Sequence, residues 1–415
     1  YSPGQSCDER MAEFLGRCHY VRGDYGSRDS FLDLYQAMRQ REGGAAANRY
    51  FYLAIPPSVF LDVARALGDA GLVSCGATEP WSRIVIEKPF GRDRSSYDEL
   101  ARSLSQVFAE DQTYRIDHYL GKEVIQNLLV LRFANIVFEP LWNRDFIQSI
   151  HIQWKENLDL EGRGGYFDNY GIIRDVVQNH LLQILALVAM EPPARFDPDC
   201  LAAEKTRVLR KIPPLSPQEL VVGQYQAGQR NGVRVAAYRD DPQVPDDSLT
   251  PTFATARLRI EVPRWQDVPV TISAGKGLDS RSTEIRVRFR EVPTNMFCAI
   301  GQCPAANELV VRVQPDEGIH LSFTTKVPGM GLVLRPEKLD LRYQQAFTEL
   351  IPDAYESLLL DVIRGDRSLF IRNQELEAAW DIFTPVLRDL ERLGVVPEPY
   401  AFGSSGPDAA RQFMP

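Results

Sequence analysis

A membrane-spanning apolar run is missing from this chain of 415 residues. Its most apolar stretch, IIRDVVQNHLLQILALVAM at 172–190, is too polar for a spanning helix, which needs about 20 consecutive, mostly apolar residues. The interrupting residues are Arg174, Asp175, Gln178, Asn179, His180 and Gln183. The stretch therefore predicts a buried helix of a soluble globular protein, and no membrane partner is expected.

An excess of positive charge is also missing. The chain has 47 Lys and Arg against 56 Asp and Glu, which gives a formal net charge of −9 at pH 7. Proteins that bind nucleic acid or anionic membrane surfaces depend on positive surface potential, so neither kind of partner is expected. An anionic ligand must instead be held by a few local Lys, Arg or His side chains.

The cysteines lack the spacing of a metal or disulfide site. Without CxxC pairs they predict neither zinc binding nor a disulfide framework. The six are Cys7, Cys18, Cys75, Cys200, Cys298 and Cys303. No signal peptide is visible at the start, YSPGQSC, which also lacks an initiator Met. We expect a reducing compartment, the cytoplasm, or a plastid if a transit peptide precedes Tyr1.

What the chain does contain begins with a strand–helix alternation over residues 1–115. Strands are predicted at 49–57, 82–90 and 113–120, and helices at 58–70 and 95–108. In the second helix Ser96 and Glu99 suggest a capping box. Its apolar face comprises Leu100, Leu104, Val107 and Phe108. The rhythm predicts a parallel α/β sheet, in which ligands bind at the carboxyl ends of the strands. The segments EKPFG and DHYLGK fall at such ends.

After residue 145 short strands dominate. They are SIHIQW, ARLRIEV, VPVTIS, TEIRVRFREV, ELVVRVQP and HLSFTTKV. In TEIRVRF apolar and charged side chains alternate, as in a half-solvated antiparallel strand. A terminal helix is predicted at 373–393. The expected fold is therefore α/β followed by α+β, the second part having a large, mostly antiparallel sheet.

One short stretch concentrates reactive side chains. RIDHYLGKE at 115–123 holds Asp117, His118, Tyr119 and Lys122, in a chain with only five histidines. An Asp–His pair in one strand is common and by itself indicates little. A second polar cluster, inside the apolar stretch at 172–190, makes the pair more interesting.

His180 lies deep in that apolar stretch. Burial depresses the pKa of a histidine and leaves a neutral imidazole that can accept a proton near pH 7, although a lone buried histidine is more often structural. Asp175 precedes it by five residues, so at 3.6 residues per turn the two side chains do not share a helix face. We therefore expect Asp117 to be the carboxylate that orients His180.

Several cations lie near predicted strand ends. Lys88 precedes a proline, Lys122 follows a glycine, and Lys276 stands in SAGKGLDSR together with Arg281. Each alone is more often a solvated surface side chain, but such a set suits a phosphate-bearing substrate in an acidic protein. Glu156 and the turn EGRGGYFDN (161–169) offer acceptors for sugar hydroxyls.

Six segments together resemble the glucose-6-phosphate dehydrogenase family. They are RIVIEKPFGRD, YRIDHYLGKE, QNLLVLRFAN, EGRGGYFDNYGIIRDVVQNHLLQ, GKGLDSR and NELVVRVQP, and they occur in the family's order. The similarity runs from about residue 12 to about residue 405. RIDHYLGKE is the family's signature stretch, so the resemblance is specific.

The resemblance implies oxidation of D-glucose 6-phosphate at C1 to 6-phosphoglucono-1,5-lactone, with hydride transfer to NADP+, the first step of the oxidative pentose phosphate pathway. It implies that His180 is the general base and that Asp117 holds its imidazole. His118, Tyr119 and Lys122 are implied to grip the phosphate. The other implied substrate residues are Lys88, Glu156, Asp175, Lys276, Arg281 and Gln314.

The resemblance implies a cofactor wall as well, formed by Leu53, Ala54, Ile55, Pro56, Pro57 and Lys88. The family's first strand and glycine-rich turn, which hold the cofactor pyrophosphate, have no counterpart here. Residues 1–115 are thus expected to be the remainder of an NADP-binding Rossmann-like domain, and 116–415 a substrate-binding and dimerisation domain. Either the protein continues before Tyr1, which we favour, or the chain is a remnant that cannot bind NADP+ normally.

Two further expectations follow from the comparison with the family. Some animal members hold a structural NADP+ at a second site, but two of its basic positions are Ser282 and Ser322 here, so that site is not expected. A homodimer or homotetramer packed through the antiparallel sheet is expected. The alternative function is a non-catalytic sugar-phosphate-binding or scaffold protein that has lost cofactor binding.

Overall fold

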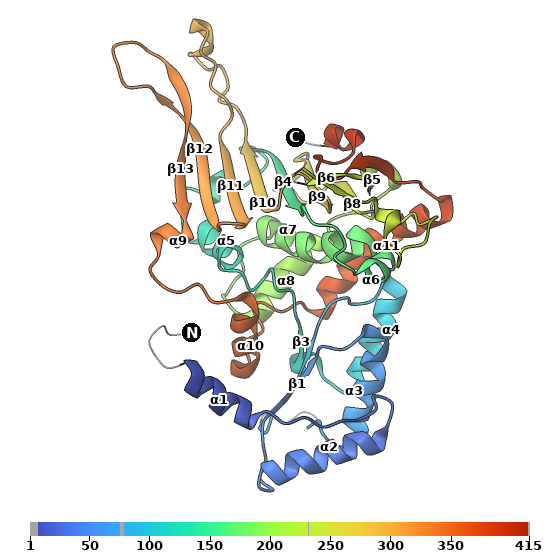
Figure 1. Ribbon diagram of the computed structural model, residues 1–415. Coiled ribbons are helices and arrows are strands. Elements are labelled where there is room, and N and C mark those ends of the chain that lie inside the picture. The colour runs from blue at the N-terminus through green and yellow to red at the C-terminus, as the bar shows by residue number, and fades with distance from the viewer. Residues whose placement is uncertain (1–6, 75–78, 231, 414–415) are drawn as a thin grey trace.

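The computed structural model describes residues 7–74, 79–230 and 232–413. It consists of a small parallel sheet with its helices and a much larger sheet backed by a layer of helices, and two long hairpins project from the larger sheet (Figure 1). No helix in the described ranges is long and apolar enough to cross a membrane.

The small sheet has the order β1-β2-β3, and all its strands are parallel. The strands are β1 (Arg49–Leu53), β2 (Ser82–Ile86) and β3 (Thr113–Arg115); the helices of this part are α1 (Cys7–Arg17), α2 (Arg28–Arg41), α3 (Phe60–Asp69) and α4 (Arg94–Ser105). Ile84, Val85 and Ile86 of the central strand are fully buried, as expected for a parallel strand covered on both faces. The predicted strand–helix alternation is confirmed.

The start of α4 differs from the prediction. Its N-cap is Asp93, whose carboxylate accepts from the backbone N–H of Ser96 at 2.8 Å, while the Ser96 hydroxyl accepts from the Asp93 N–H. The predicted Ser96–Glu99 capping box is therefore wrong, because the helix begins at Arg94 and Ser96 is its third residue, where it completes the capping box with Asp93. The predicted apolar face is confirmed, with Leu104 and Phe108 buried.

The large sheet has nine strands in the order β13-β12-β11-β10-β4-β9-β8-β5-β14. Their bounds are β4 (Ile147–Lys155), β5 (Leu220–Gln226), β8 (Phe253–Leu258), β9 (Val270–Gly275), β10 (Ser282–Phe289), β11 (Glu308–Gln314), β12 (Gly318–Lys326), β13 (Leu334–Arg342) and β14 (Glu398–Ala401). Most neighbours are antiparallel, as predicted, but β4 pairs with β9 and β14 with β5 in parallel. Parallel neighbours need long crossovers, and here these contain all of the helical layer except α5, which precedes β4.

The helices of that layer are α5 (Glu123–Phe133), α6 (Gly164–Asp168), η4 (Ile173–Leu181), α7 (Leu182–Ala189), α8 (Pro198–Leu209) and α11 (Asn373–Leu393). The predicted buried helix at 172–190 is confirmed as η4 followed by α7, every residue of α7 being buried. Its first part is π-helical, with hydrogen bonds that span five residues instead of four. The predicted terminal helix at 373–393 is confirmed as α11.

Helix α10 (Ala354–Arg364) was not predicted. It returns to the small sheet, where Leu358 and Val362 are fully buried against residues of β2 and β3. Its neighbour Gly121, in DHYLGK, has no room for a side chain, since a Cβ there would lie 2.7 Å from the Ala354 carbonyl oxygen. The glycine beside Lys122 therefore allows close packing of α10.

A disulfide joins Cys298 to Cys303 in the loop between β10 and β11. The sequence predicted no disulfide framework, and this single pair does not form one; it joins two residues five apart in a loop, a spacing that no motif signals. Cys18 and Cys200 are free thiols, and Cys75 lies outside the described residues. The remaining elements are β6 (Gly228–Arg230), β7 (Val233–Val235), α9 (Tyr343–Ala346), η1 (Pro57–Val59), η2 (Glu110–Gln112), η3 (Glu139–Leu141), η5 (Pro217–Glu219), η6 (Tyr238–Asp240), η7 (Cys298–Ile300) and η8 (Asp408–Phe413).

Candidate active site

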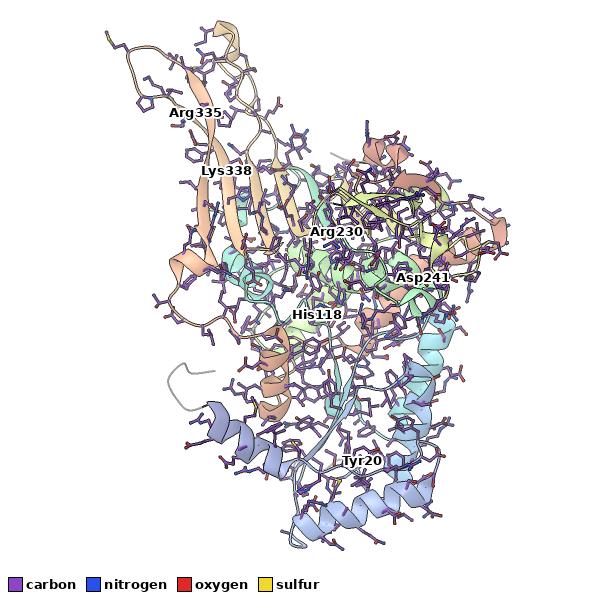
Figure 2. All side chains as sticks on the ribbon, in the orientation of Figure 1. Tyr20, His118, Arg230, Asp241, Arg335 and Lys338 are labelled. Carbon is purple, nitrogen blue, oxygen red and sulfur yellow. A yellow bond between two sulfur atoms is a disulfide. The ribbon has the colours of Figure 1, made fainter. Side chains whose placement is uncertain are left out.

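A cavity of about 790 Å³ lies where the carboxyl ends of β1 and β2 meet the helical layer and the large sheet. His118, on the segment after β3, lies near the centre of the molecule between the two parts (Figure 2). The cavity is lined by most of the predicted site residues: Ala54, Ile55, Lys88, His118, Tyr119, Glu156, Asp175, His180, Lys276, Arg281 and Gln314. The structure therefore brings together segments that are far apart in the sequence.

A close contact between these segments joins His180 to Asp117. His180 Nδ1 lies 2.6 Å from Asp117 Oδ1, and both side chains are almost fully buried. Burial raises the pKa of Asp117, but the charge of His180 and its hydrogen bond outweigh burial, so that this pKa lies below its usual range. An ionised carboxylate at Nδ1 fixes the ring and leaves Nε2 as the nitrogen that can take a proton.

Asp117 stands at the point where the chain leaves β3. Its Oδ1 also accepts from the backbone N–H of Tyr119 at 2.9 Å, which ties the carboxylate to the turn that follows. Its Oδ2 is buried and has no hydrogen-bond partner among the described residues. Asp117 thus holds a charge that only His180 and local dipoles balance.

The π-helical segment η4 changes the expected position of Asp175. Residues five apart lie over one another in a π-helix, so Asp175 and His180 both line the cavity. The prediction that these two side chains do not share a face is wrong, because it assumed 3.6 residues per turn. Lys88 Nζ donates to Asp175 Oδ1 and to its carbonyl oxygen, both at 2.8 Å.

Tyr119 and His118 flank the His180 ring. Tyr119 stacks on His180 with ring centroids 4.6 Å apart, and its hydroxyl accepts from Trp154 Nε1 at 2.7 Å and Gln314 Nε2 at 3.1 Å. Burial and the neighbouring His180 lower the pKa of His118 to about 4, so its imidazole is neutral at pH 7. Burial raises the pKa of Tyr119 to about 12. Both side chains are therefore neutral hydrogen-bonding groups.

The cavity wall contains a second ion pair besides Lys88–Asp175. Lys276 Nζ donates to Glu156 Oε2, and the ammonium group also lies over the rings of Trp154 and Phe167. Together with Lys88–Asp175 this arrangement gives the cavity alternating cations and carboxylates. Such a lining suits a ligand that carries both hydroxyls and negative charge.

Five predicted residues do not line the cavity, and one of them is Asp117, which contacts His180. Lys122 is the N-cap residue of α5, with Nζ 5.8 Å from the centroid of the Tyr119 ring. Leu53 is buried and lines another cavity, while Pro56 and Pro57 follow it in the turn before α3. These last three residues lie beside the carboxyl end of β1 rather than in the cavity wall.

Sequence reasoning missed other lining residues, among them Glu87, Trp154, Arg163, Tyr166 and Tyr355. Glu87 adjoins Lys88, Trp154 is two residues from Glu156, and Arg163 and Tyr166 belong to the singled-out turn at 161–169, so proximity to known segments was an available signal. Tyr355 had none, because α10 brings it from far along the chain. It stacks on His118 with centroids 5.8 Å apart and planes 10° apart.

Asp117, His118 and His180 also offer donor atoms within 4.8 Å of one another, a spacing that could hold a metal ion. The hydrogen bond between Asp117 and His180 already uses one donor atom of each. The geometry therefore serves proton transfer as it stands.

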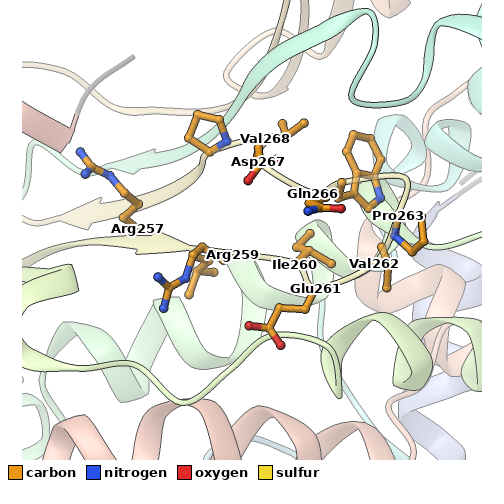
Figure 3. A pocket seen from close by; sticks show the side chains of 12 residues that line it. Arg257, Arg259, Ile260, Glu261, Val262, Pro263, Gln266, Asp267 and Val268 are labelled. Carbon is orange, nitrogen blue, oxygen red and sulfur yellow. The ribbon is translucent and has the colours of Figure 1, made fainter.

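Another large cavity, of about 720 Å³, lies in the hairpin between β8 and β9 (Figure 3). Its wall comes from the single segment 257–269 and contains no histidine. It does not join parts of the chain that are distant in sequence. The cavity around His180 is therefore the better candidate for chemistry.

Comparison with known proteins agrees with this geometry. The model of the glucose-6-phosphate dehydrogenase NAD-binding domain matches residues 2–127, and that of the C-terminal domain of the same enzyme matches residues 129–415. The chloroplastic glucose-6-phosphate 1-dehydrogenase 1 of Arabidopsis thaliana is 50% identical, over 98% of this chain and 70% of its own length. The cytoplasmic form 5 of the same plant is 45% identical, over 98% and 77%.

Solved structures show the same similarity. A glucose-6-phosphate dehydrogenase in complex with glucose 6-phosphate has a TM-score of 0.91 at 41% identity, covering all of this chain and 85% of that one. The glucose-6-phosphate 1-dehydrogenase of Mycobacterium avium has a TM-score of 0.83 at 36% identity, with 98% and 82% covered.

Proposed function

The chain belongs to the glucose-6-phosphate dehydrogenase family, and we propose from this premise that the cavity around His180 is where the family reaction takes place. The protein is an oxidoreductase with a nicotinamide cofactor. Its reaction oxidises D-glucose 6-phosphate at C1 to 6-phosphoglucono-1,5-lactone. The observation that carries the assignment of the site is the 2.6 Å contact between His180 and Asp117 in the wall of a cation-lined cavity.

His180 acts as the general base. Its Nε2 takes the proton of the C1 hydroxyl while the hydrogen on C1 leaves with its electron pair, so that C1 and its oxygen form the lactone carbonyl. A nicotinamide dinucleotide, when bound, would supply the acceptor for this hydride. Asp117 stabilises the imidazolium that forms, because it is ionised and buried beside Nδ1.

The other residues position the sugar phosphate. His118, Tyr119 and Lys122 bind the phosphate, the first two as neutral donors and Lys122 as a charge behind the Tyr119 ring. Glu156 and Asp175 accept hydrogen bonds from sugar hydroxyls, each held in place by a lysine. Arg281 and Gln314 complete the substrate pocket.

The carboxyl ends of β1 and β2 fit the nicotinamide end of the cofactor. Ala54, Ile55 and Lys88 line the cavity at these ends, where Rossmann-type sheets bind dinucleotides. We propose NADP+ as the dinucleotide, with Leu53, Pro56 and Pro57 shaping the turn behind the wall and Lys88 between sugar and cofactor.

The assignment of the base is tested with His180→Asn. We expect loss of NADPH production, while glucose 6-phosphate still binds with a dissociation constant within a few-fold of the original. Turnover near the original rate would mean that another group is the base. Calorimetry for binding and NADPH absorbance for turnover separate the two outcomes.

The alternative function, a non-catalytic sugar-phosphate-binding protein, is not favoured. Relatives named dehydrogenase are 50% identical over 98% of the chain. That alternative predicts glucose 6-phosphate binding with no NADPH formed by the unaltered protein, so the same assay decides between them.

We propose a homodimer or homotetramer that packs through the large sheet. Its outer strand β13 is exposed along most of its length, including Leu339 and Leu341 (Figure 1). Figure 2 shows that Arg335 and Lys338 belong to the same strand, so polar groups border this apolar surface. For the compartment we propose the cytoplasm, with the plastid as alternative, since relatives of both kinds match.

A further inference from the structure

A second cleft of about 790 Å³ lies away from the active-site cavity. Its walls are α8, η2 and the segment 366–374, which joins α10 to α11. Because η2 directly precedes β3, the cleft lies at the amino end of that strand, whereas Asp117 and His118 follow its carboxyl end. Its volume is in the range of small-molecule sites.

The charges in this cleft are unbalanced in favour of cations. The cationic lining residues are Arg207, Arg210, Lys211, Arg367 and Arg372, and the acidic ones are Glu110, Asp111 and Asp199. Glu110 is already neutralised outside the cleft, because it accepts from Arg115 at 2.8 and 3.0 Å and from the backbone N–H of Asn373 at 3.0 Å. Arg207 is likewise paired outside the cleft, with Nη1 2.9 Å from Glu204 Oε1. Four cations thus face two remaining carboxylates.

Two of the arginines converge on a single carboxylate oxygen. Arg372 Nη2 lies 3.0 Å and Arg367 Nη2 3.6 Å from Asp199 Oδ1. The arginine side chains are only 6% and 19% exposed, whereas that of Asp199 is 81% exposed. Two held guanidinium groups therefore share one mostly solvated, singly charged acceptor.

Arg372 carries the clearest sign of an incomplete site. Its Nε is buried and has no hydrogen-bond partner among the described residues. Burial and the neighbouring charge of Arg367 place the pKa of Arg372 below its usual range, so the two guanidinium groups repel each other. It also forms the N-cap of α11, whose amino end adds partial positive charge.

We propose that this cleft is a second anion site, which binds a phosphate group between Arg367 and Arg372 in the place now shared by the Asp199 carboxylate. A phosphate dianion offers three acceptor oxygens and twice the charge of a carboxylate, and arginine pairs bind it in the bidentate manner. The group comes either from inorganic phosphate or from a phosphate monoester, whose remaining atoms the volume beside Arg210 and Lys211 accommodates.

Calorimetric titration with inorganic phosphate, and separately with ribose 5-phosphate, tests the proposal. We expect two classes of site in the unaltered protein, one in the active-site cavity and one in the cleft. Arg367→Gln should weaken the cleft class at least tenfold. Asp199→Asn should tighten the same class several-fold, because it removes the competing carboxylate while keeping the side-chain shape.

The matched controls are Arg411→Gln and Asp408→Asn, which change the same charges in an exposed ion pair elsewhere and should leave both classes unchanged. Lys122→Gln should weaken only the other class, which separates this proposal from the assignment of the active site. Equal affinities for the two probes support a site for phosphate itself, and tighter ribose 5-phosphate binding supports a site for monoesters.

A single class of sites that Lys122→Gln weakens and Arg367→Gln does not, or a cleft class that Arg367→Gln does not weaken, overturns the proposal. So does an unchanged or weaker affinity in Asp199→Asn. Asp199 is mostly exposed, so Asp199→Asn is expected to fold. It therefore keeps the test decisive if Arg367→Gln fails to fold.

Discussion

The proposed proton acceptor, His180, depends on a contact with Asp117, which lies 63 positions earlier in the chain. His180 is held by helix packing and Asp117 by the turn after β3, so neither side chain has to move to meet the other. Because both are buried, water does not screen their interaction, and the carboxylate acts on the imidazole at full strength. The catalytic pair is thus organised before substrate binds.

We predict that Asp117→Asn lowers kcat by about 10²- to 10⁴-fold, as expected when the residue that fixes a histidine tautomer is neutralised. The amide keeps the shape of the carboxylate, so KM for glucose 6-phosphate should change by less than about threefold. Steady-state NADPH formation measures both constants. A kcat within tenfold of the original would contradict the role of Asp117, and the exposed Asp145→Asn serves as control.

A second residue-scale prediction concerns acid sensitivity. Burial and the neighbouring Arg286 lower the pKa of His151 to about 4, from 6.5 in the unfolded chain. Between these values the unfolded chain binds a proton that the folded protein does not. The contribution of His151 to the free energy of unfolding is therefore fully present above pH 6.5 and decreases towards pH 4. His118 adds to this in the same direction.

His151→Gln should therefore reduce the slope of unfolding free energy against pH by up to about 1.4 kcal/mol per pH unit in this window. Urea unfolding from pH 4.5 to 7.5 gives the slopes of both proteins. The exposed His19→Gln serves as the control. Identical slopes for His151→Gln and the original protein would show that His151 is protonated in the folded state.

Much of the site could be predicted at this scale, because RIDHYLGKE concentrates groups that seldom occur together. The position of Asp175 could not, since a sequence does not reveal a π-helical turn and the usual period places the side chain elsewhere. Tyr355 could not be predicted either, because its stacking on His118 depends on how α10 folds back. Lys122 was predicted to grip the phosphate, yet it does not line the cavity, and its Nζ lies 5.8 Å from the centroid of the Tyr119 ring.

At the scale of elements, α8 and α11 are joined by a buried ion pair. Lys205 Nζ lies 2.8 Å from Glu375 Oε2, and neither side chain is more than 2% exposed. Glu375 also accepts from the backbone N–H of Arg372 at 3.1 Å and so helps to cap α11. A buried pair of this kind stabilises little by itself, but either charge left alone is costly.

We predict that Lys205→Met lowers the free energy of unfolding by about 3–5 kcal/mol, because it leaves the Glu375 carboxylate buried without a cation. Adding Glu375→Gln should restore most of the loss, since the amide carries no charge and still accepts from Arg372. Urea unfolding of the single and double variants measures the difference. A double variant no more stable than Lys205→Met would contradict this account.

Long elements with strong periodicity were predictable, and their boundaries were less so. Helix α11 agrees with its predicted range because its apolar stripe and terminal glycine leave little choice. The start of α4 was misplaced by one turn, since Asp93 and Ser96 are both capable caps and only packing decides between them. Helix α10 was missed because it packs on a sheet whose sequence lies more than two hundred residues earlier.

At the scale of the whole molecule, α10 connects the two parts. It packs Leu358 and Val362 against the small sheet, and Arg83 of β2 donates to the carbonyls of Val362 and Ile363 at 2.5 and 2.8 Å. The sequence predicted both sheets but not this link, nor the two parallel pairings in the large sheet. Pairings between distant strands leave no local pattern from which they could be inferred.

The proposed oligomer is tested with Leu339→Glu. Leu339 is 60% exposed on β13. Burying a leucine contributes about 1.5–3 kcal/mol, and a two-fold symmetric interface would bury this residue in both subunits. We predict that a charge there weakens self-association at least 100-fold, measured by sedimentation equilibrium. Leu393→Glu, at the exposed end of α11, is the matched control. Unchanged association in Leu339→Glu would place the interface elsewhere.

The edge of the large sheet also has a consequence for synthesis on the ribosome. β5 gains its outer neighbour only from β14, which pairs Glu398 with Gly223 and is therefore translated about 175 residues later. At about 5–20 residues per second, the growing chain carries that strand edge uncovered for roughly 10–35 s. Unpaired edges invite association with other chains, so the nascent protein is expected to need chaperones during this interval.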